Sequence, residues 1–169
     1  MLSETIEKAL NEQTHAEFYS SYLYLAVAAW FNDQQLDGFA TWMEVQAREE
    51  FEHGMKLFHH IMDRGGTVVL EAIDKPPATW GSPSAAVKAV LDHERYITGR
   101  INDLANLANQ ENDHATSVFL HWYIAEQVEE ESTADRLYHR TAMLDDSPHG
   151  LLMLDRELAA RGNGSGDED

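Results

Sequence analysis

Four glutamates occupy positions in this chain of 169 residues at which apolar residues are expected. Four segments each carry apolar residues at alternating spacings of three and four, the pattern of a helix that buries one face. Near the middle of each segment the pattern is interrupted by Glu17, Glu50, Glu94 or Glu130. If the helices pack together, the four carboxylates converge inside the bundle, where unpaired charges are costly. A positive partner is therefore expected among them.

The helices are expected to be long and joined by short turns. The first covers residues 3–31, and a polar link at 32–35 leads into a second that ends at Arg64 before two glycines. The third covers residues 83–110, and a polar turn at 111–113 leads into the fourth. Because the two turns are short, each joins a pair of antiparallel helices.

The connection between the second and third helices is long and contains Pro76 and Pro77, so an extended conformation is expected. Roughly 18 extended residues reach about 60 Å, whereas a helix of about 27 residues is about 40 Å long. The link can therefore cross the whole bundle, which predicts an all-α up-down-down-up four-helix bundle with one long crossover. A short fifth helix is expected over residues 148–160, after Ser147.

The chemistry of the buried positions indicates a metal site. His53 follows Glu50 by three residues and lies on the same helix face, so an imidazole joins the carboxylates. Imidazole with several carboxylates suits iron or manganese better than zinc or magnesium. Four carboxylates are neutralised by two divalent cations, so the pattern predicts a dinuclear centre.

A second acidic group lies one step round the helices from the first. Glu49, Glu126 and Glu129 could form an adjoining cation site that shares Glu130, or they could be solvated surface acids. Tyr24 lies two turns beyond Glu17, close enough to pass an electron or to hydrogen-bond a ligand; the alternative is a buried tyrosine with a satisfied hydroxyl. Trp122 is expected in the core. The remaining eight histidines are expected at the surface.

Composition excludes several classes of function. The 30 acidic and 12 basic residues give a formal charge of −18, which argues against nucleic-acid binding. The absence of cysteine excludes disulfides, iron–sulfur clusters and thiolate zinc sites. Residues 1–11 lack the apolar core of a signal peptide, and the longest apolar run, 22–31, is about half a membrane span. A cytoplasmic protein without membrane partners is expected, with one domain over residues 1–161 and a disordered acidic tail over 162–169.

The chain resembles a prokaryotic non-haem ferritin over about residues 2–161. Ferritin-like folds are a known case of the single-crossover bundle. The resemblance rests on five motifs: Asn11-Glu12-Gln13 through Glu17, Tyr22-Leu23-Tyr24-Leu25, Glu49-Glu50-Phe51-Glu52-His53-Gly54, Asp92-His93-Glu94, and the run from Trp122 to Glu130. A sixth, Leu151-Leu152-Met153-Leu154-Asp155, lies in the fifth helix.

The resemblance implies a ferroxidase centre. One iron would be held by Glu17, Glu50 and His53, and the other by Glu50, Glu94 and Glu130, with Glu50 bridging them and Gln127 close by. Glu49, Glu126, Glu129 and Glu130 match a third iron site of bacterial members. The family oxidises Fe(II) with O₂ or peroxide and stores Fe(III) as a mineral in a homo-oligomeric cage of 24 subunits. The fifth helix would line the four-fold axes of that cage.

Departures from related subfamilies narrow the expectation. Haem-binding bacterioferritins have a second Glu-x-x-His on the fourth helix and a methionine after the second helix's glutamate, whereas this chain has Gln127-x-x-Glu130 and Phe51. No haem is therefore expected. Rubrerythrin-like peroxidases need cysteine ligands, which this chain lacks. The small DNA-protecting ferritins place their metals between subunits, whereas the ligands expected here lie within one bundle.

Two other functions stay open at this stage. A stand-alone diiron oxidase would bind only its stoichiometric iron, and an acidic interaction module would tolerate the loss of Glu50. The suggested third site and the fifth helix favour storage over the first alternative. The shared position of the four glutamates remains unexplained by the second.

Overall fold

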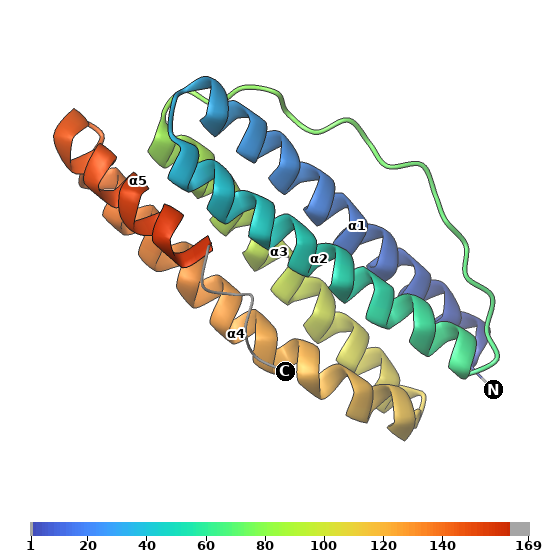
Figure 1. Ribbon diagram of the computed structural model, residues 1–169. Coiled ribbons are helices and arrows are strands. Elements are labelled where there is room, and N and C mark those ends of the chain that lie inside the picture. The colour runs from blue at the N-terminus through green and yellow to red at the C-terminus, as the bar shows by residue number, and fades with distance from the viewer. Residues whose placement is uncertain (1, 163–169) are drawn as a thin grey trace.

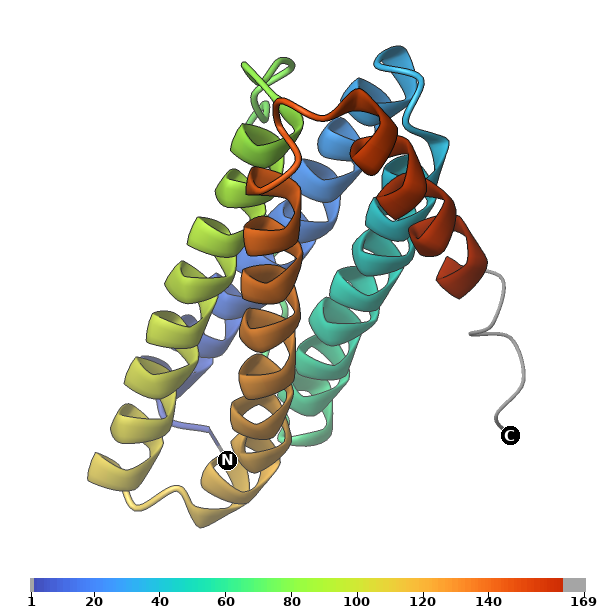
Figure 2. The ribbon, with the colours of Figure 1, turned by 90° about the vertical axis from the view of Figure 1, so that its left-hand side faces the viewer.

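The structure, a computed structural model, describes residues 2–162 and contains five helices over that range (Figure 1). They are α1 (Glu4–Asp33), α2 (Asp37–Asp63), α3 (Pro83–Gln110), α4 (His114–Ala142) and α5 (Pro148–Gly162). The first four form the expected up-down-down-up bundle, in which α1 packs against α2 and α3, and α3 packs against α4. The short fifth helix lies across one end of the bundle against α2 (Figure 2). The tail predicted over 162–169 lies, beyond Gly162, outside the described residues.

Side-chain caps fix where three of the helices begin. The hydroxyl of Ser3 accepts a hydrogen bond from the amide of Ile6 at 3.3 Å, and Ser82 accepts one from Ala85 at 3.1 Å. Asp113 accepts one from the amide of Thr116 at the start of α4, also at 3.1 Å. Each cap satisfies an amide that has no partner within its helix. The start of α3 predicted from Ser82 is confirmed.

Three helices are followed by a residue with a positive φ, in the left-handed region of the Ramachandran plot. Gly65 has φ +73° after α2, as its position behind Arg64 predicts. Gln35 after α1 and Asn112 after α3 have φ +60° and +55°. Asparagine tolerates this region, but glutamine rarely adopts it, so the sharp turn at Gln35 carries no sequence signal. These turns send the chain back along the preceding helix.

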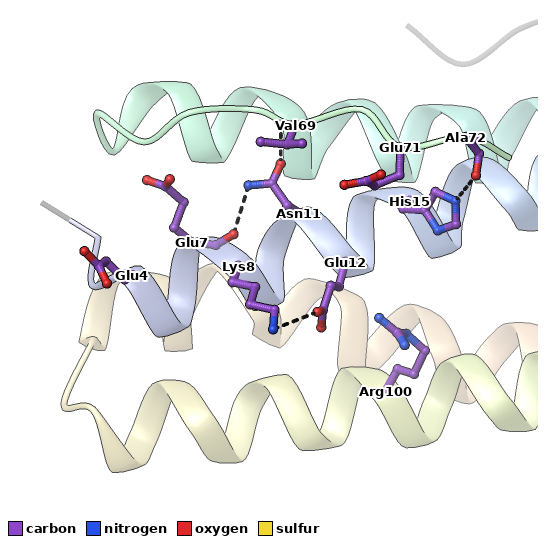
Figure 3. A pocket seen from close by; sticks show the side chains of 10 residues that line it. All are labelled: Glu4, Glu7, Lys8, Asn11, Glu12, His15, Val69, Glu71, Ala72 and Arg100. Atoms are coloured by element: carbon purple, nitrogen blue, oxygen red, sulfur yellow. Dashed lines mark hydrogen bonds and ion pairs between the residues drawn. The ribbon is translucent and has the colours of Figure 1, made fainter.

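The crossover between α2 and α3 runs along the outside of α1, from one end of the bundle to the other (Figure 1). Asn11 holds it on both sides, because its amide donates to the carbonyl of Thr67 at 2.9 Å and accepts from the amide of Val69 at 2.7 Å. His15 lies 3.0 Å from the carbonyl of Ala72 (Figure 3). These contacts provide hydrogen-bond partners for backbone groups of the crossover, because an extended segment has no partners within itself.

Helix α5 is fastened to the beginning of α2 by a buried carboxylate. Asp155 is only 9% exposed and accepts a hydrogen bond from the backbone amide of Phe39 at 3.0 Å. An acid at this end of a helix also meets the positive end of the helix dipole. The close approach depends on Gly38, where an added Cβ would lie 1.7 Å from the carbonyl oxygen of Asp155.

The apolar core is divided into two clusters, one on either side of the bundle's midpoint. One contains residues such as Phe31, Phe39 and Met43, and the other contains residues such as Ile61 and Ile101. The apolar residues at spacings of three and four on either side of the four glutamates are buried, apart from Phe119, which is partly buried. None of the helices within residues 2–162 has the length and apolar character needed to cross a membrane.

Candidate metal centre

The four mid-helix glutamates converge between the two apolar clusters. Their exposed fractions are small: 1% for Glu17 and Glu50, 3% for Glu94 and 9% for Glu130. Each comes from a different helix of the bundle, because the apolar spacing on either side turns that position inward. The bundle therefore encloses four carboxyl groups and one imidazole, His53, which is 5% exposed.

The side chains form overlapping groups with the geometry of metal ligands. Glu17, Glu50 and His53 offer ligand atoms within 4.8 Å of one another, and so do Glu50, Glu94 and Glu130. The two groups share Glu50, so this carboxylate is placed to contribute to two neighbouring ions. This is the pairing that the resemblance implies for a dinuclear centre.

Three buried carboxylate oxygens within residues 2–162 have no hydrogen-bond partner. They are Oε2 of Glu17, Oε1 of Glu50 and Oε2 of Glu130. A buried polar atom without a partner costs about 1–3 kcal/mol, and more if it is charged. One such oxygen on each of three converging glutamates, with oxygen and imidazole donors at hand, fits a pair of divalent iron ions. The donor set is therefore suited to Fe(II) as a bound substrate.

Without metal the carboxyl groups hold protons. Burial raises the pKa of Glu17 to about 7 and that of Glu130 to about 10. Burial, and then the negative charges of Glu17, Glu130 and Glu94, raises the pKa of Glu50 well above its usual range. Burial also raises the pKa of Glu94. At pH 7 several of the carboxyl groups are thus neutral, and metal binding must displace their protons.

His53 is held as a neutral ligand. Burial, aided by the charge of Lys56, lowers the pKa of His53 to about 4, so its contacts of 3.7 Å with Glu50 and Glu130 are not ion pairs at pH 7. The hydroxyl of Tyr123 donates to the backbone carbonyl of His53 at 2.6 Å. A neutral imidazole has a lone pair available for a metal.

Two further predicted residues surround Glu94. The hydroxyl of Tyr24, fully buried, donates a hydrogen bond to Oε1 of Glu94. The amide of Gln127 lies 3.2 Å from Oε2 of the same carboxylate and 3.3 Å from its backbone carbonyl. Both residues therefore contact a candidate ligand. The hydroxyl of Tyr24 is satisfied by a candidate ligand, which is compatible with both interpretations of that residue.

The second acidic group is assembled only in part. Glu126 forms a third ligand group with His53 and Glu130, with ligand atoms within 4.8 Å of one another. Glu49 is exposed, and its pKa is raised by partial burial and then by the charges of Glu126 and Glu52, so these carboxylates lie within electrostatic range of one another. Glu129 is also exposed and belongs to no such group within the described residues.

Three aromatic or imidazole side chains lie differently from expectation. Trp122 is 38% exposed and carries the ammonium of Lys56 over its ring at 3.2 Å, so its expected place in the core is wrong. His93 is half-buried beside the metal centre, where its Nε2 lies 2.8 Å from the hydroxyl of Ser20. His60 is also half-buried and stacks on Phe119 at 3.9 Å. Both histidines lie next to the buried face of their helix. The three- and four-residue spacing of apolar residues does not show how far round the helix that buried face extends.

Sequence reasoning missed the polar support of Glu17. The side-chain amide of Gln13 donates to Oε1 of Glu17 at 2.7 Å, and Arg100 donates to the side-chain oxygen of Gln13 at 2.9 Å. The hydrogen bond from Gln13 and the positive charge of Arg100 both oppose the effect of burial on the pKa of Glu17. Gln13 lies on the apolar stripe of α1, a signal that could have marked it, but Arg100 lies on none.

Fold and site together define a four-helix-bundle protein with a buried carboxylate–histidine centre inside one subunit. The family model for ferritin, described as a ferritin-like domain, matches residues 7–145. The chain therefore belongs to the ferritin family, and the resemblance seen in its motifs is confirmed.

Relatives and solved structures agree over nearly the whole chain. The chain is 37% identical over 161 residues to a bacterial non-heme ferritin of Bacteroides fragilis, which covers 95% of this chain and 100% of the relative. It is 37% identical over 158 residues to a probable bacterial non-heme ferritin-like protein of Haemophilus influenzae, covering 94% and 96% of the two chains. The open-pore ferritin of the hyperthermophilic archaeon Archaeoglobus fulgidus superimposes with a TM-score of 0.93 at 46% identity, covering 94% of this chain and 98% of that one.

Proposed function

We propose that this ferritin stores iron, and that it oxidises Fe(II) at the dinuclear centre before storage. One Fe(II) binds to Glu17, Glu50 and His53, and the second to Glu50, Glu94 and Glu130. The observation that carries the proposal is the set of three unpartnered carboxylate oxygens, buried on glutamates that face one another. Membership of the ferritin family supports storage, and iron is then the substrate and cargo of the protein rather than a permanent cofactor.

The side chains of the centre bind the iron and exchange protons for it. Two Fe(II) ions carry the charge that four ionised carboxylates need, so their arrival releases the protons held by groups such as Glu17 and Glu130. The two ions supply two electrons, which O₂ or peroxide accepts. Gln127 and Tyr24 hold Glu94 by hydrogen bonds to its two oxygens and so keep that ligand in place as charge changes. No haem takes part in this proposal.

The second acidic group is proposed as a third iron site that adjoins the centre. Glu126 and Glu130 supply its best-supported ligands, because they lie together with His53. Glu49 lies within electrostatic range of Glu126 and is proposed to join them. Glu129 would need to turn inward, since it is exposed in the isolated subunit.

Storage also requires assembly, and we include a homo-oligomer, of 24 subunits in its complete form, in the proposal. On α5, Leu152 and Met153 are 49% and 61% exposed in the isolated subunit and offer apolar surface for a neighbouring subunit. Residues 1–161 would act as a single diiron domain in the cytoplasm, with no nucleic acid or membrane as a partner. The formal charge of −18 suits a shell that attracts cations.

The decisive experiment measures iron retained per subunit after repeated aerobic additions of Fe(II) and removal of free iron. A storage cage should retain far more iron than the two or three ions that the ligands hold. Retention that stops at two or three ions would instead identify a stand-alone diiron oxidase. No retained iron would refute iron storage altogether.

The site assignment is tested by initial rates of Fe(II) oxidation in two variants and a control. Glu50→Ala and Glu130→Ala should each lose most of the rate, because each removes a ligand of the second ion. Glu44→Ala removes an exposed acid of the same helix as Glu50, one that lies 3.7 Å from Arg48, and should leave the rate unchanged. Full rates in both ligand variants would show that the site is wrongly assigned and would favour an interaction module.

A further inference from the structure

We propose that Gln13 and Arg100 are positioning residues that select which oxygen of Glu17 faces the metal. The inference rests on the proposed function of the dinuclear centre. It concerns a chain of hydrogen bonds that begins on α3, crosses to α1 and ends on a candidate ligand.

Gln13 holds one oxygen of the Glu17 carboxylate by a hydrogen bond. The side-chain nitrogen of Gln13 donates to Oε1 of Glu17 at 2.7 Å, in a contact that is buried on both sides. Oε2 of Glu17 has no partner. The amide therefore occupies one oxygen and leaves the other without a partner, and Glu17 belongs to the ligand group that contains Glu50 and His53.

Arg100 sets the orientation of the side-chain amide of Gln13. A glutamine side chain has a donor end and an acceptor end of nearly equal size, whereas a guanidinium group can only donate. Nε of Arg100 donates to Oε1 of Gln13 at 2.9 Å, so the acceptor end must face Arg100 and the donor end must face Glu17. Without Arg100 the amide loses this constraint, and in the reversed orientation its oxygen would meet the carboxylate of Glu17.

Arg100 is itself held in place by a neighbour on its own helix. Its Nη1 donates to the hydroxyl of Tyr96 at 3.2 Å, one turn earlier on α3. Its side chain reaches toward α1 and lines an outer cavity of about 500 Å³ between α1, the crossover and α3 (Figure 3). Gln13, by contrast, is 1% exposed. The guanidinium thus bridges from the outer surface to a fully buried amide.

The arrangement affects one half of the centre more than the other. Glu94 receives hydrogen bonds from Tyr24 and Gln127, which do not involve Arg100. Disturbing the chain from Arg100 should therefore weaken the ion held by Glu17 and leave the other ion nearly unaffected. A residue that merely stabilised the fold would not separate the two ions in this way.

The test is an anaerobic titration with Co(II), followed by its visible absorption, in the full-length protein freed of metal. Wild-type protein should bind two ions per subunit in the dinuclear centre. Arg100→Met and Gln13→Leu should each weaken one of the two binding steps by about 10-fold to 100-fold, the usual effect of losing a residue that orients a metal ligand. Arg100→Lys keeps a donor without an acceptor and should recover much of the affinity.

Arg95→Met is the matched control, because Arg95 lies on the same helix but pairs with half-buried acids of α4, Asp135 at 3.1 Å and Glu131 at 3.5 Å. It should leave both binding steps unchanged. Equal weakening of both steps in Arg100→Met and Gln13→Leu, or no weakening of either, overturns the proposal. Thermal unfolding of the same samples detects a variant that is merely misfolded. If wild-type protein itself fails to bind two ions, the dinuclear centre fails, and the inference fails with it.

Discussion

Replacing Glu130 by glutamine should make the metal-free protein less sensitive to alkaline pH. Burial, followed by the charges of Glu94 and Glu17, raises the pKa of Glu130 from its ordinary value of 4.5 to about 10. Between these two values the folded protein holds a proton on Glu130 that the unfolded chain releases. Unfolding therefore becomes easier as pH rises through this range. Glutamine has nearly the same shape and no proton to release, so the variant lacks this contribution.

The size of the effect follows from the pKa difference. One proton bound in the folded state and released on unfolding changes the free energy of unfolding by about 1.4 kcal/mol per pH unit. From pH 7.5 to 9.0 the wild-type protein should lose about 2 kcal/mol relative to Glu130→Gln. For a domain of this size that corresponds to a change of roughly 4–8 °C in the difference between their melting temperatures. His53 contributes little in this window, because its lowered pKa of about 4 leaves it neutral when folded, and the unfolded imidazole is neutral above its usual pKa of 6.5.

The assay is thermal unfolding, followed by circular dichroism, of protein treated with a chelator at several pH values from 7.5 to 9.0. Glu12→Gln is the control, since Glu12 is exposed on α1 and lies 3.8 Å from Lys8. Its melting temperature should follow that of the wild type at every pH. A constant difference between Glu130→Gln and wild type, or one that moves in the opposite direction, would refute the assignment of a proton to Glu130. Saturating Co(II) should stabilise the wild type more than Glu130→Gln, because the variant has lost a metal ligand.

Three further perturbations test other parts of the structure. Gly38→Ala places a Cβ 1.7 Å from the carbonyl of Asp155, so α5 should leave its place; size-exclusion chromatography should show altered assembly, and an unchanged profile would contradict this. Tyr24→Phe removes the hydroxyl that holds Glu94 and should weaken one of two Co(II) binding steps by about tenfold, whereas unchanged titrations would make Tyr24 a packing residue. Asp113→Ala removes the cap of α4 and should lower the free energy of unfolding by about 1 kcal/mol at pH 7 in urea titrations. The last difference should disappear at a pH low enough to protonate the carboxylate, whose pKa is lowered by Arg64 and the capped amide against the opposing effect of burial.

The fold and the convergence of the four glutamates could be predicted because both depend on helical periodicity. A carboxylate on an apolar stripe must point inward wherever its neighbours three and four residues away do, and Glu17 and Glu94 obey this rule. The long crossover was predictable from its prolines and its length. The identity of the ligands as a functional set remains a prediction, since geometry alone does not show which of them bind iron.

Other features depend on the rotation and spacing of packed helices, which a single sequence does not specify. Trp122 follows a position that faces outward and precedes Tyr123, which faces inward, so a small rotation of α4 decides whether its ring is covered. His93 is half-buried beside α1, where its Nε2 lies 2.8 Å from the hydroxyl of Ser20. The bond from Arg100 to Gln13 joins residues 87 positions apart and depends on how closely α1 approaches α3. Periodicity identifies a buried face, but it does not identify these partners.

We expect the bundle to keep its fold without metal, because an apolar cluster lies on either side of the centre. Fully buried apolar side chains contribute about 1.5–3 kcal/mol each, and several lie on either side of the carboxylates, including Phe39 and Ile61. Small zinc domains lack such a core and unfold when the metal leaves. A protein that takes up iron as a substrate must instead keep its fold each time the centre empties. Protons on Glu17, Glu50 and Glu130 make this possible, because they neutralise the carboxylates until Fe(II) displaces them.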